Sequence, residues 1–287
     1  MCPQLDDAVY AASKELRGRG APDPDVVFLL ATGGRVPPGA GEIAWRLPLS
    51  SVSGVPTPWR GKELFASEAH GATFWTIVDA PGDEETGNSL DANAPAWTPG
   101  FPVWLAACSG ASLAVHAGAG FSLDAEGDAR VGTLSLTSDH INFSGRTPLL
   151  GLGQSRLGSI FPDQTSLHHE SLRRRAQELA DERGIPTSEA VVGCALSPSQ
   201  LTPAERRWFA RAGAQIGAFG LADPLIAMAH AGLSCLSIIA VLEGAKRMDL
   251  KTQIIAADKL APALDDLLGA LVSDLARTAF ELREETV

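Results

Sequence analysis

Short apolar runs recur along the chain and are separated by polar, glycine-rich or proline-rich segments. They lack the regular polar alternation of a strand that has one face in water, and such runs are typical of strands covered on both faces. The sequence therefore predicts a sheet buried between layers of other structure. The runs are VVFLLA (26–31), ATFWTIV (72–78), ASLAVHAG (111–118), RVGTLSL (130–136), AVVGCAL (190–196), QIGAFG (215–220) and SCLSIIAVL (234–242).

Helical patterns alternate with several of these runs. Apolar positions at helical spacing fill 168–184, which stops at a glycine, and 202–213 begins with a Thr cap, a proline in the first turn and a glutamate three residues after the cap. The segment 223–232 begins with Asp-Pro, and 260–284 is amphipathic. Alternating strands and helices predict an α/β protein with a mostly parallel, wound sheet. No repeat or interdomain linker is visible, so residues 1–287 are expected to form one domain.

Net charge and composition limit the classes of partner that the chain is expected to bind. The formal net charge of −11 over 287 residues opposes binding to nucleic acid and to anionic membrane surfaces. There is no apolar run long enough to span a bilayer and no secretory signal pattern. The cysteines are far apart and form no CxxC pair, which favours a reduced, cytoplasmic protein. They are Cys2, Cys108, Cys194 and Cys235.

The stretch SDHINFSGRTPLLG (138–151) gathers polar groups at the end of an apolar run. Asp139, His140 and Asn142 are too close in sequence to form a metal site alone, because neighbours in a strand point to opposite faces. No HExxH motif accompanies them. A buried hydrogen-bonding role at a strand end is expected, with no metal and no cofactor. The remaining histidines have no evident nucleophile partner, and there is no GxSxG motif.

Two glycine-rich segments follow apolar runs. LLATGGRVPPGAG (29–41) places Thr32 and Gly33 directly after a predicted strand, and HAGAGF (116–121) is expected to be a second turn of this kind. Backbone N–H groups and a hydroxyl at the carboxyl end of a strand can bind an anion, although a plain flexible turn explains the glycines equally well. Glu243 ends the run SIIAVLE: either it is partly buried and suited to proton donation, or it is a solvated residue at the start of a loop.

Several segments together resemble trimeric purine nucleoside phosphorylases. DHIN followed by TPLLG is similar to the family's D-H-I-N and N-P-L-x-G, and PDVVFLLATGG to its first strand and Gly-Ser-Gly phosphate loop. SIFPDQTSLHHESL resembles F-P-x-M-S-D-A-Y, and SPSQLTPAERRWFARAGAQIGAFG resembles G-P-S-[FY]-E-T-x-A-E and the strand after it. AHAGLSCLSIIAVLE resembles R-x-x-G-L-x-V-x-x-x-S-x-x-T-N. The resemblance runs from about Asp23 to the C-terminal helix. It implies a three-layer α/β/α fold with a twisted mixed central sheet, a homotrimer, and DHIN as mainly scaffold.

The family's reaction is phosphorolysis, in which phosphate attacks C1′ of a purine nucleoside and releases the base and ribose 1-phosphate. The resemblance places the phosphate loop at Thr32 and Gly33, and the backbone-donating alanine at Ala117 after His116. It places the family's phosphate-binding Arg, His and Tyr on Pro81, Asp83 and Glu85, and a later phosphate-binding Ser on Gly220. Arg35 is the nearby cation that would substitute, since 63–129 contains no Lys or Arg and its acidic part repels a dianion.

Positions that the family uses for the base and the ribose have changed as well. Its aromatic-Glu pair falls on Gln200 and Leu201, and Leu201 cannot accept a hydrogen bond from a purine N–H. Its Thr-Asn pair falls on Leu242 and Glu243. The ribose-contacting Met becomes Phe219, and the His that binds the 5′-hydroxyl falls near Asp258. The Phe that reaches into the neighbouring subunit falls at Leu157.

Three functions remain open from the sequence. The chain is a divergent enzyme in which Glu243 protonates a purine-like leaving base while phosphate or water attacks near Thr32 and Ala117. Alternatively, it is a catalytically inactive homologue that binds a nucleoside-like ligand or a protein partner. In the third, purely structural interpretation, the polar loop 79–100 is a protein-contact surface; loops of that length are usually functional or disordered.

Overall fold

The computed structural model describes residues 4–31, 34–78, 94–123, 130–195, 201–244 and 248–286. The strands are β1 (Val26–Leu30), β2 (Ile43–Pro48), β3 (Glu63–Ala69), β4 (Ala72–Ile77), β5 (Leu113–Ser122), β6 (Leu134–Asn142), β7 (Thr187–Ala195), β8 (Ile216–Phe219) and β9 (Ser234–Glu243). The α-helices are α1 (Leu5–Gly18), α2 (Thr57–Arg60), α4 (Phe101–Ser109), α5 (Glu170–Arg183), α6 (Pro203–Arg211), α7 (Ala222–His230) and α8 (Leu250–Thr286). Two 3₁₀ turns, η1 (Leu49–Ser51) and η2 (Thr98–Gly100), complete the set.

All the described strands belong to one mixed sheet of order β2-β3-β4-β1-β5-β8-β7-β6-β9. Strand β5 pairs with β1, β8 and β9, so β5, β8, β7, β6 and β9 close on themselves. The centre is parallel (β4-β1-β5-β9), whereas β2 and β3 pair antiparallel at one edge. The α/β class and the twisted mixed sheet flanked by helices are confirmed, and the closure of five strands is the added feature.

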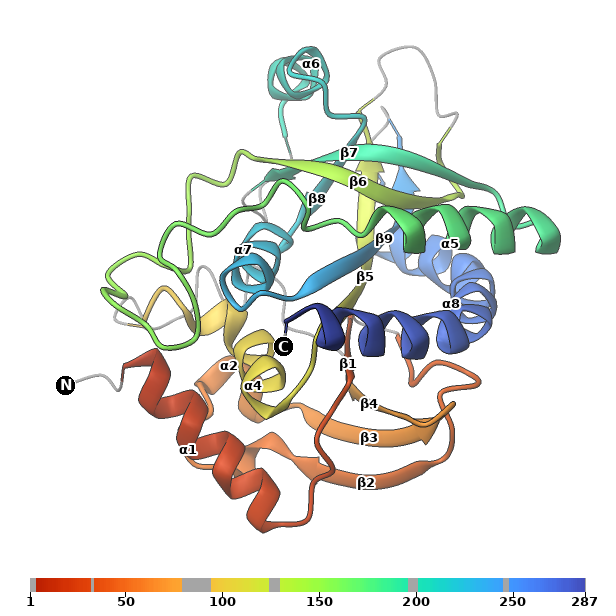
Figure 1. Ribbon diagram of the computed structural model, residues 1–287. Helices are drawn as coiled ribbons and strands as arrows, with labels where there is room; N and C mark the ends of the chain where they lie inside the picture. The colour runs from red at the N-terminus through yellow and green to blue at the C-terminus, as the bar shows by residue number, and fades with distance from the viewer. Residues whose placement is uncertain are drawn as a thin grey trace.

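Two layers of helices cover the sheet. Helices α1, α4 and α7 pack in one core cluster, and α5 and the inner part of α8 pack in the other, on the opposite side of β1 and β5 (Figure 1). Residues alternate between the two clusters along β5, because Ala114 belongs to the first and Val115 to the second. None of the helices among the described residues is both long enough and apolar enough to cross a membrane.

The segment HAGAGF is not the turn that the sequence predicts, because it lies inside β5. Its glycines serve the closure of the sheet. A Cβ atom at Gly120 would lie 2.7 Å from the carbonyl oxygen of Gly217, and one at Gly217 would overlap the ring of Phe121. Strands β5 and β8 therefore approach each other only because neither residue has a side chain.

Candidate functional site

A pocket of about 180 Å³ opens beside the carboxyl-terminal parts of β1, β5 and β9. These strands are mutually parallel, so their ends meet at one edge of the sheet, where ligands of wound α/β proteins bind. Helix α8 forms the opposite wall with residues three or four positions apart, a stripe typical of one helix face. The lining is mostly apolar and small. From the strands and the loop after β1 it includes Leu30, Ala31, Gly34, Ala117, Gly118, Ala119, Ala240 and Leu242, and from α8 Ile254, Ala257, Ala261, Leu264 and Leu268.

Three charged side chains line this pocket: Arg35, Asp258 and Asp265. Arg35 donates from Nε to Oδ2 of Asp265 at 2.6 Å, and its Nη2 pairs with the same oxygen. The Arg35 side chain is 69% exposed, whereas that of Asp265 is 11% exposed. The described lining residues thus include two carboxylates and one guanidinium, and this guanidinium is already paired with Asp265.

The structure brings some of the predicted site residues together at this pocket. Arg35, Ala117 and Asp258 line it directly. Thr32 and Gly33 lie outside the described residues, but Ala31 and Gly34 on either side of them line the pocket. Gln200 and the acidic segment 79–93, with Pro81, Asp83 and Glu85, also fall outside the described ranges.

His116 lies on the other face of β5 from Ala117, away from the pocket lining. Its Nδ1 is 3.3 Å from the hydroxyl of Ser237, its register partner on β9. Burial without a charged partner lowers the pKa of His116 to about 4, so the ring is neutral at pH 7. Ser237 is fully buried in the sheet, and this His–Ser contact is therefore structural.

Leu201 and Phe219 pack in a small apolar cluster under α6 and are not in the pocket lining. The Phe219 ring lies 5.2 Å from that of Phe121, centroid to centroid. Gly220 follows in the left-handed conformation (φ 69°), which favours glycine. Leu201 and Phe219 thus make packing contacts, and neither lines the pocket.

Glu243 is only 5% exposed, so the expectation of a solvated residue is wrong. Its Oε1 accepts a 2.7 Å hydrogen bond from Nη2 of Arg206 on α6. Its Oε2 accepts from the backbone N–H of Met248 at 3.1 Å and from Nε2 of Gln253 on α8 at 3.0 Å. Both oxygens act as acceptors, and a proton-donating role would require one of these contacts to open. Leu242, the preceding residue, lines the pocket, whereas Glu243 does not.

Leu157, expected at a subunit interface, is half-buried and packs on its own chain's core. The most exposed apolar side chains of this region are instead Leu150 (74% exposed) and Phe161 (85% exposed), with Ile160 at 41%. Asn142 is also exposed rather than buried. It organises the turn that follows β6, accepting from the N–H and hydroxyl of Ser144 and donating to the carbonyl of Arg146.

Sequence reasoning missed Asp265 and the α8 stripe that forms one pocket wall. The amphipathic pattern of the C-terminal segment does predict an apolar helix face. Periodicity alone does not tell which part of that face packs in the core and which part lines a pocket. The helix begins at Leu250, ten residues before the predicted segment, and Pro262 lies inside it.

Comparison with known proteins agrees with this geometry. Residues 100–272 match the model of the phosphorylase superfamily. The chain belongs to the phosphorylase superfamily. It is 27% identical to purine nucleoside phosphorylase 1 of Geobacillus stearothermophilus, over 80% of this chain and 82% of that protein. It is 30% identical to purine nucleoside phosphorylase 1 of Bacillus subtilis, where the match spans about half of each protein, 50% of this chain and 53% of the relative.

Solved structures of the superfamily share the fold. The Schistosoma purine nucleoside phosphorylase in complex with hypoxanthine has a TM-score of 0.81 at 14% identity, covering 94% of this chain and 98% of that one. The isoform 2 enzyme of Schistosoma mansoni with cytosine and ribose-1-phosphate has a TM-score of 0.79 at 16% identity, covering 95% and 98%. The resemblance inferred from the sequence motifs is confirmed at the level of family and fold.

Proposed function

We propose that the chain binds a purine nucleoside-like molecule in the pocket beside β1, β5 and β9 and cleaves its N-glycosidic bond, with phosphate as the co-substrate. The observation that carries the proposal is this pocket. The segments that resemble the phosphate loop and the backbone-donating alanine, distant in sequence, both contribute to its lining through Gly34 and Ala117. The named relatives are purine nucleoside phosphorylases, which supports the same reaction class.

The residues divide between two tasks. The loop of Thr32 and Gly33 and the guanidinium of Arg35 hold the phosphate, after Arg35 exchanges Asp265 for the ligand. Negative charge that develops on the leaving base needs a proton or a hydrogen-bond donor. Glu243 supplies the proton only if its contact with Arg206, Met248 or Gln253 opens and the carboxylate takes up a proton from solvent before the bond breaks. Asp258 accepts a hydrogen bond from a ribose hydroxyl.

The test is base release. The purified chain is incubated with inosine, guanosine and adenosine, with and without phosphate, and the free base is measured by chromatography. We expect release that depends on phosphate and is reduced in Asp258→Asn. Release without phosphate would mean that the chain is a hydrolase, with water as the nucleophile, and not a phosphorylase. Glu243→Gln with unchanged turnover would remove the assigned acid role while leaving the reaction in place.

A second candidate function is a homologue that binds a nucleoside-like ligand without turning it over. The pairing of Arg35 with Asp265 and of Glu243 with Arg206 favours it, since both groups needed for chemistry already have partners. It predicts binding of a nucleoside, measured by calorimetry, with no base release from any member of the panel.

We also propose that the chain forms a homotrimer, with Phe161 rather than Leu157 reaching the neighbouring subunit. The support is the 85% exposure of the Phe161 ring, which leaves a large apolar side chain in water in the single chain. Sedimentation equilibrium tests this: we expect a trimer, and a shift toward monomer in Phe161→Ser. A monomeric wild-type chain would contradict it.

A further inference from the structure

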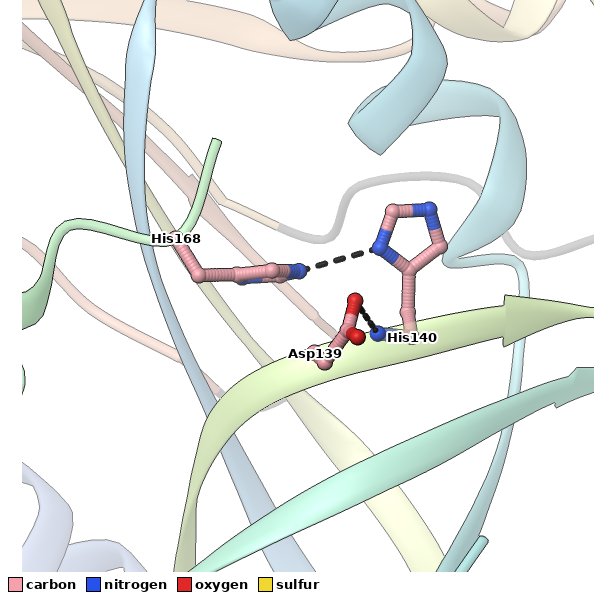
Figure 2. A group of neighbouring side chains, drawn as sticks. All are labelled: Asp139, His140 and His168. Carbon is pink, nitrogen blue, oxygen red and sulfur yellow. Dashed lines mark hydrogen bonds between the residues drawn. The ribbon is translucent and has the colours of Figure 1, made fainter. Parts of the chain in front are cut away.

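A second cluster of potential ligands lies outside the nucleoside pocket. Asp139 and His140 on β6 and His168 before α5 place one ligand atom each within 4.8 Å of one another (Figure 2). Nδ1 of His140 is 3.0 Å from Nε2 of His168. None of the three residues lines the pocket, and the proposed glycosidic reaction does not use them.

The Asp139 carboxylate reaches the His140 ring because it folds back along the strand. Asp139 and His140 pair with consecutive residues of β7, Val191 and Val192, so their side chains leave the backbone on alternating faces. The register of β6 against β7 shifts one step earlier, between Thr137 and Asp139. The carboxylate of Asp139 also accepts from the backbone N–H of His140 at 2.7 Å, which fixes their relative orientation.

The third ligand comes from a segment fixed to β9. Beyond Leu136 β6 has no further register partner on β9, and the segment around His168 instead pairs with Cys235 near the start of β9. The N–H of Cys235 donates to Leu167, and the N–H of His169 donates to Cys235. Arg173 donates to the carbonyl of His168. The His168 ring is therefore held in place by backbone contacts on both sides before any ligand arrives.

We propose that Asp139, His140 and His168 form a binding site for a divalent transition-metal ion of the zinc class. Two imidazole nitrogens on a tetrahedral zinc ion at about 2.0–2.1 Å lie roughly 3.3 Å apart, close to the observed separation of 3.0 Å. Two nitrogens and one carboxylate leave a coordination position open for water, and nitrogen-rich sites favour zinc or cobalt over magnesium or calcium.

The burial of the three residues and the protonation state of the two imidazoles agree with a metal site. His168 is 8% exposed, His140 is half-buried and Asp139 is exposed, so the site opens to solvent on the carboxylate side. Neutral imidazoles are the form that binds metal, and the burial of both rings favours that form. Metal binding moves the proton shared between the rings to an outer nitrogen. The Gln164 side chain lies within hydrogen-bond reach of the His140 ring, so its Oε1 can accept a hydrogen bond from the ring N–H that remains.

The site is a feature of this chain rather than of the family motif. In the segment that resembles F-P-x-M-S-D-A-Y, counting from Phe161 places His168 on the tyrosine. Without the imidazole of His168, Asp139 and His140 would offer a metal ion only two ligand atoms. The proposal is therefore independent of nucleoside cleavage and stands or falls on metal binding itself.

The experiment titrates the full chain, freed of metal with a chelator, with Co²⁺ and then with Zn²⁺. We expect one equivalent of Co²⁺ to give visible absorption typical of a four- or five-coordinate site, and Zn²⁺ to displace it. His140→Gln and His168→Gln each lower the Zn²⁺ affinity at least roughly tenfold, and Asp139→Asn lowers it less. His70→Asn is the matched control, because it removes an exposed imidazole from a left-handed turn position where asparagine is tolerated.

A measurement on the wild-type chain guards against variants that fail to fold. The sequence has 6 histidines, and ¹H–¹⁵N spectra of their side chains report each ring separately. We expect one equivalent of Zn²⁺ to shift the signals of His140 and His168 and to leave the others in place. The proposal would be overturned if the chain bound Zn²⁺ more weakly than a surface histidine does. It would also be overturned if all the rings responded equally to Zn²⁺, or if both glutamine variants kept the Zn²⁺ affinity of the wild-type chain.

Discussion

Two arginine–carboxylate pairs flank the ends of the parallel strands, and they differ in burial. In the pair that lines the pocket, the Arg35 side chain is 69% exposed and that of Asp265 is 11% exposed, and Asp265 is the ion-pair partner of Arg35 among the described residues. In the pair under α6, Arg206 is 16% and Glu243 is 6% exposed, and Glu243 also accepts from Met248 and Gln253. Arg206 in turn donates to the carbonyl oxygens of Ser122 and Gly244.

This difference separates a group that a ligand can recruit from one that holds the structure together. The exposed guanidinium of Arg35 keeps most of its hydration, so it can exchange one partner for another at little cost. A buried carboxylate surrounded by donors is costly to disturb, since removing one partner leaves the other desolvated and unpaired. The residue that the sequence marks as the acid, Glu243, has the environment of a structural link between β9, α6 and α8, whereas Arg35 has that of an adaptable binding residue.

The largest expected effect is on folding stability. Glu243→Gln removes the charge that compensates Arg206 and is expected to lower the free energy of unfolding by about 2–4 kcal/mol. Urea unfolding followed by circular dichroism measures it.

Glu170→Gln is the matched control, because Glu170 and its partner Arg174 are both exposed and the loss of this pair should cost less than about 1 kcal/mol. Equal stability of the two variants would mean that the link under α6 is no stronger than a surface pair. The double variant Arg206→Met, Glu243→Gln should recover part of the loss, since it leaves no unpaired buried charge.

Much of the fold follows from local sequence signals. The capping box at Thr202 and Glu205 and the left-handed Gly184 after α5 are present where the sequence places them. The edge strand β2 and its neighbour β3 escape prediction. Strand β2 is exposed or half-exposed throughout and β3 mixes polar with apolar residues, so neither has the apolar run of a central strand. Helix α4 escapes because it is apolar on nearly all sides and shows no helical period.

The site was less predictable because it depends on long-range contacts. Glu243 and Arg206 are 37 positions apart, and nothing near either residue reports the pair. The pairing of Arg35 with Asp265 joins the loop after β1 to the middle of α8, 230 positions away. The Asp139 carboxylate lies near the two imidazoles because it accepts from the backbone N–H of His140, and a contact of this kind has no sequence signature.

The contrast between paired and unpaired buried groups extends to His116, which is desolvated without a charged partner. Its folded-state pKa of about 4 lies below the ordinary value of 6.5. As the pH falls below 6.5 the unfolded chain takes up a proton that folded His116 does not, so stability decreases until about pH 4. The loss is on the order of 1–3 kcal/mol.

Denaturant unfolding at several values of pH between 4 and 7 tests this titration. His116→Gln should flatten part of the slope and leave the part that comes from His168, whose pKa is also lowered to about 4. An unchanged slope in the variant would show that His116 takes up its proton equally in both states. His70→Asn, at an exposed position, should leave the slope unaltered.

The pocket pair is expected to act on ligand affinity rather than on folding. Arg35→Met should weaken the binding of inorganic phosphate by roughly tenfold or more, since a hydrogen bond to a charged group contributes about 1.5–3 kcal/mol. Isothermal titration calorimetry gives the affinity. Arg174→Met is a matched control, because that side chain is also 69% exposed and pairs with Glu170 on the surface. Identical phosphate binding in the two variants would restrict Arg35 to its contact with Asp265.

The smallest expected effect is a gain. Asp265→Asn removes the charge that competes with phosphate for Arg35, so the affinity for phosphate should rise a few-fold, while Arg35→Met should weaken it. The two substitutions together should bind as weakly as Arg35→Met alone, because the benefit of removing Asp265 depends on the guanidinium that it releases. If Asp265→Asn strengthens binding equally with and without Arg35, the aspartate acts by general repulsion. Arg35 would then not exchange Asp265 for phosphate, although its exposure indicates that it can.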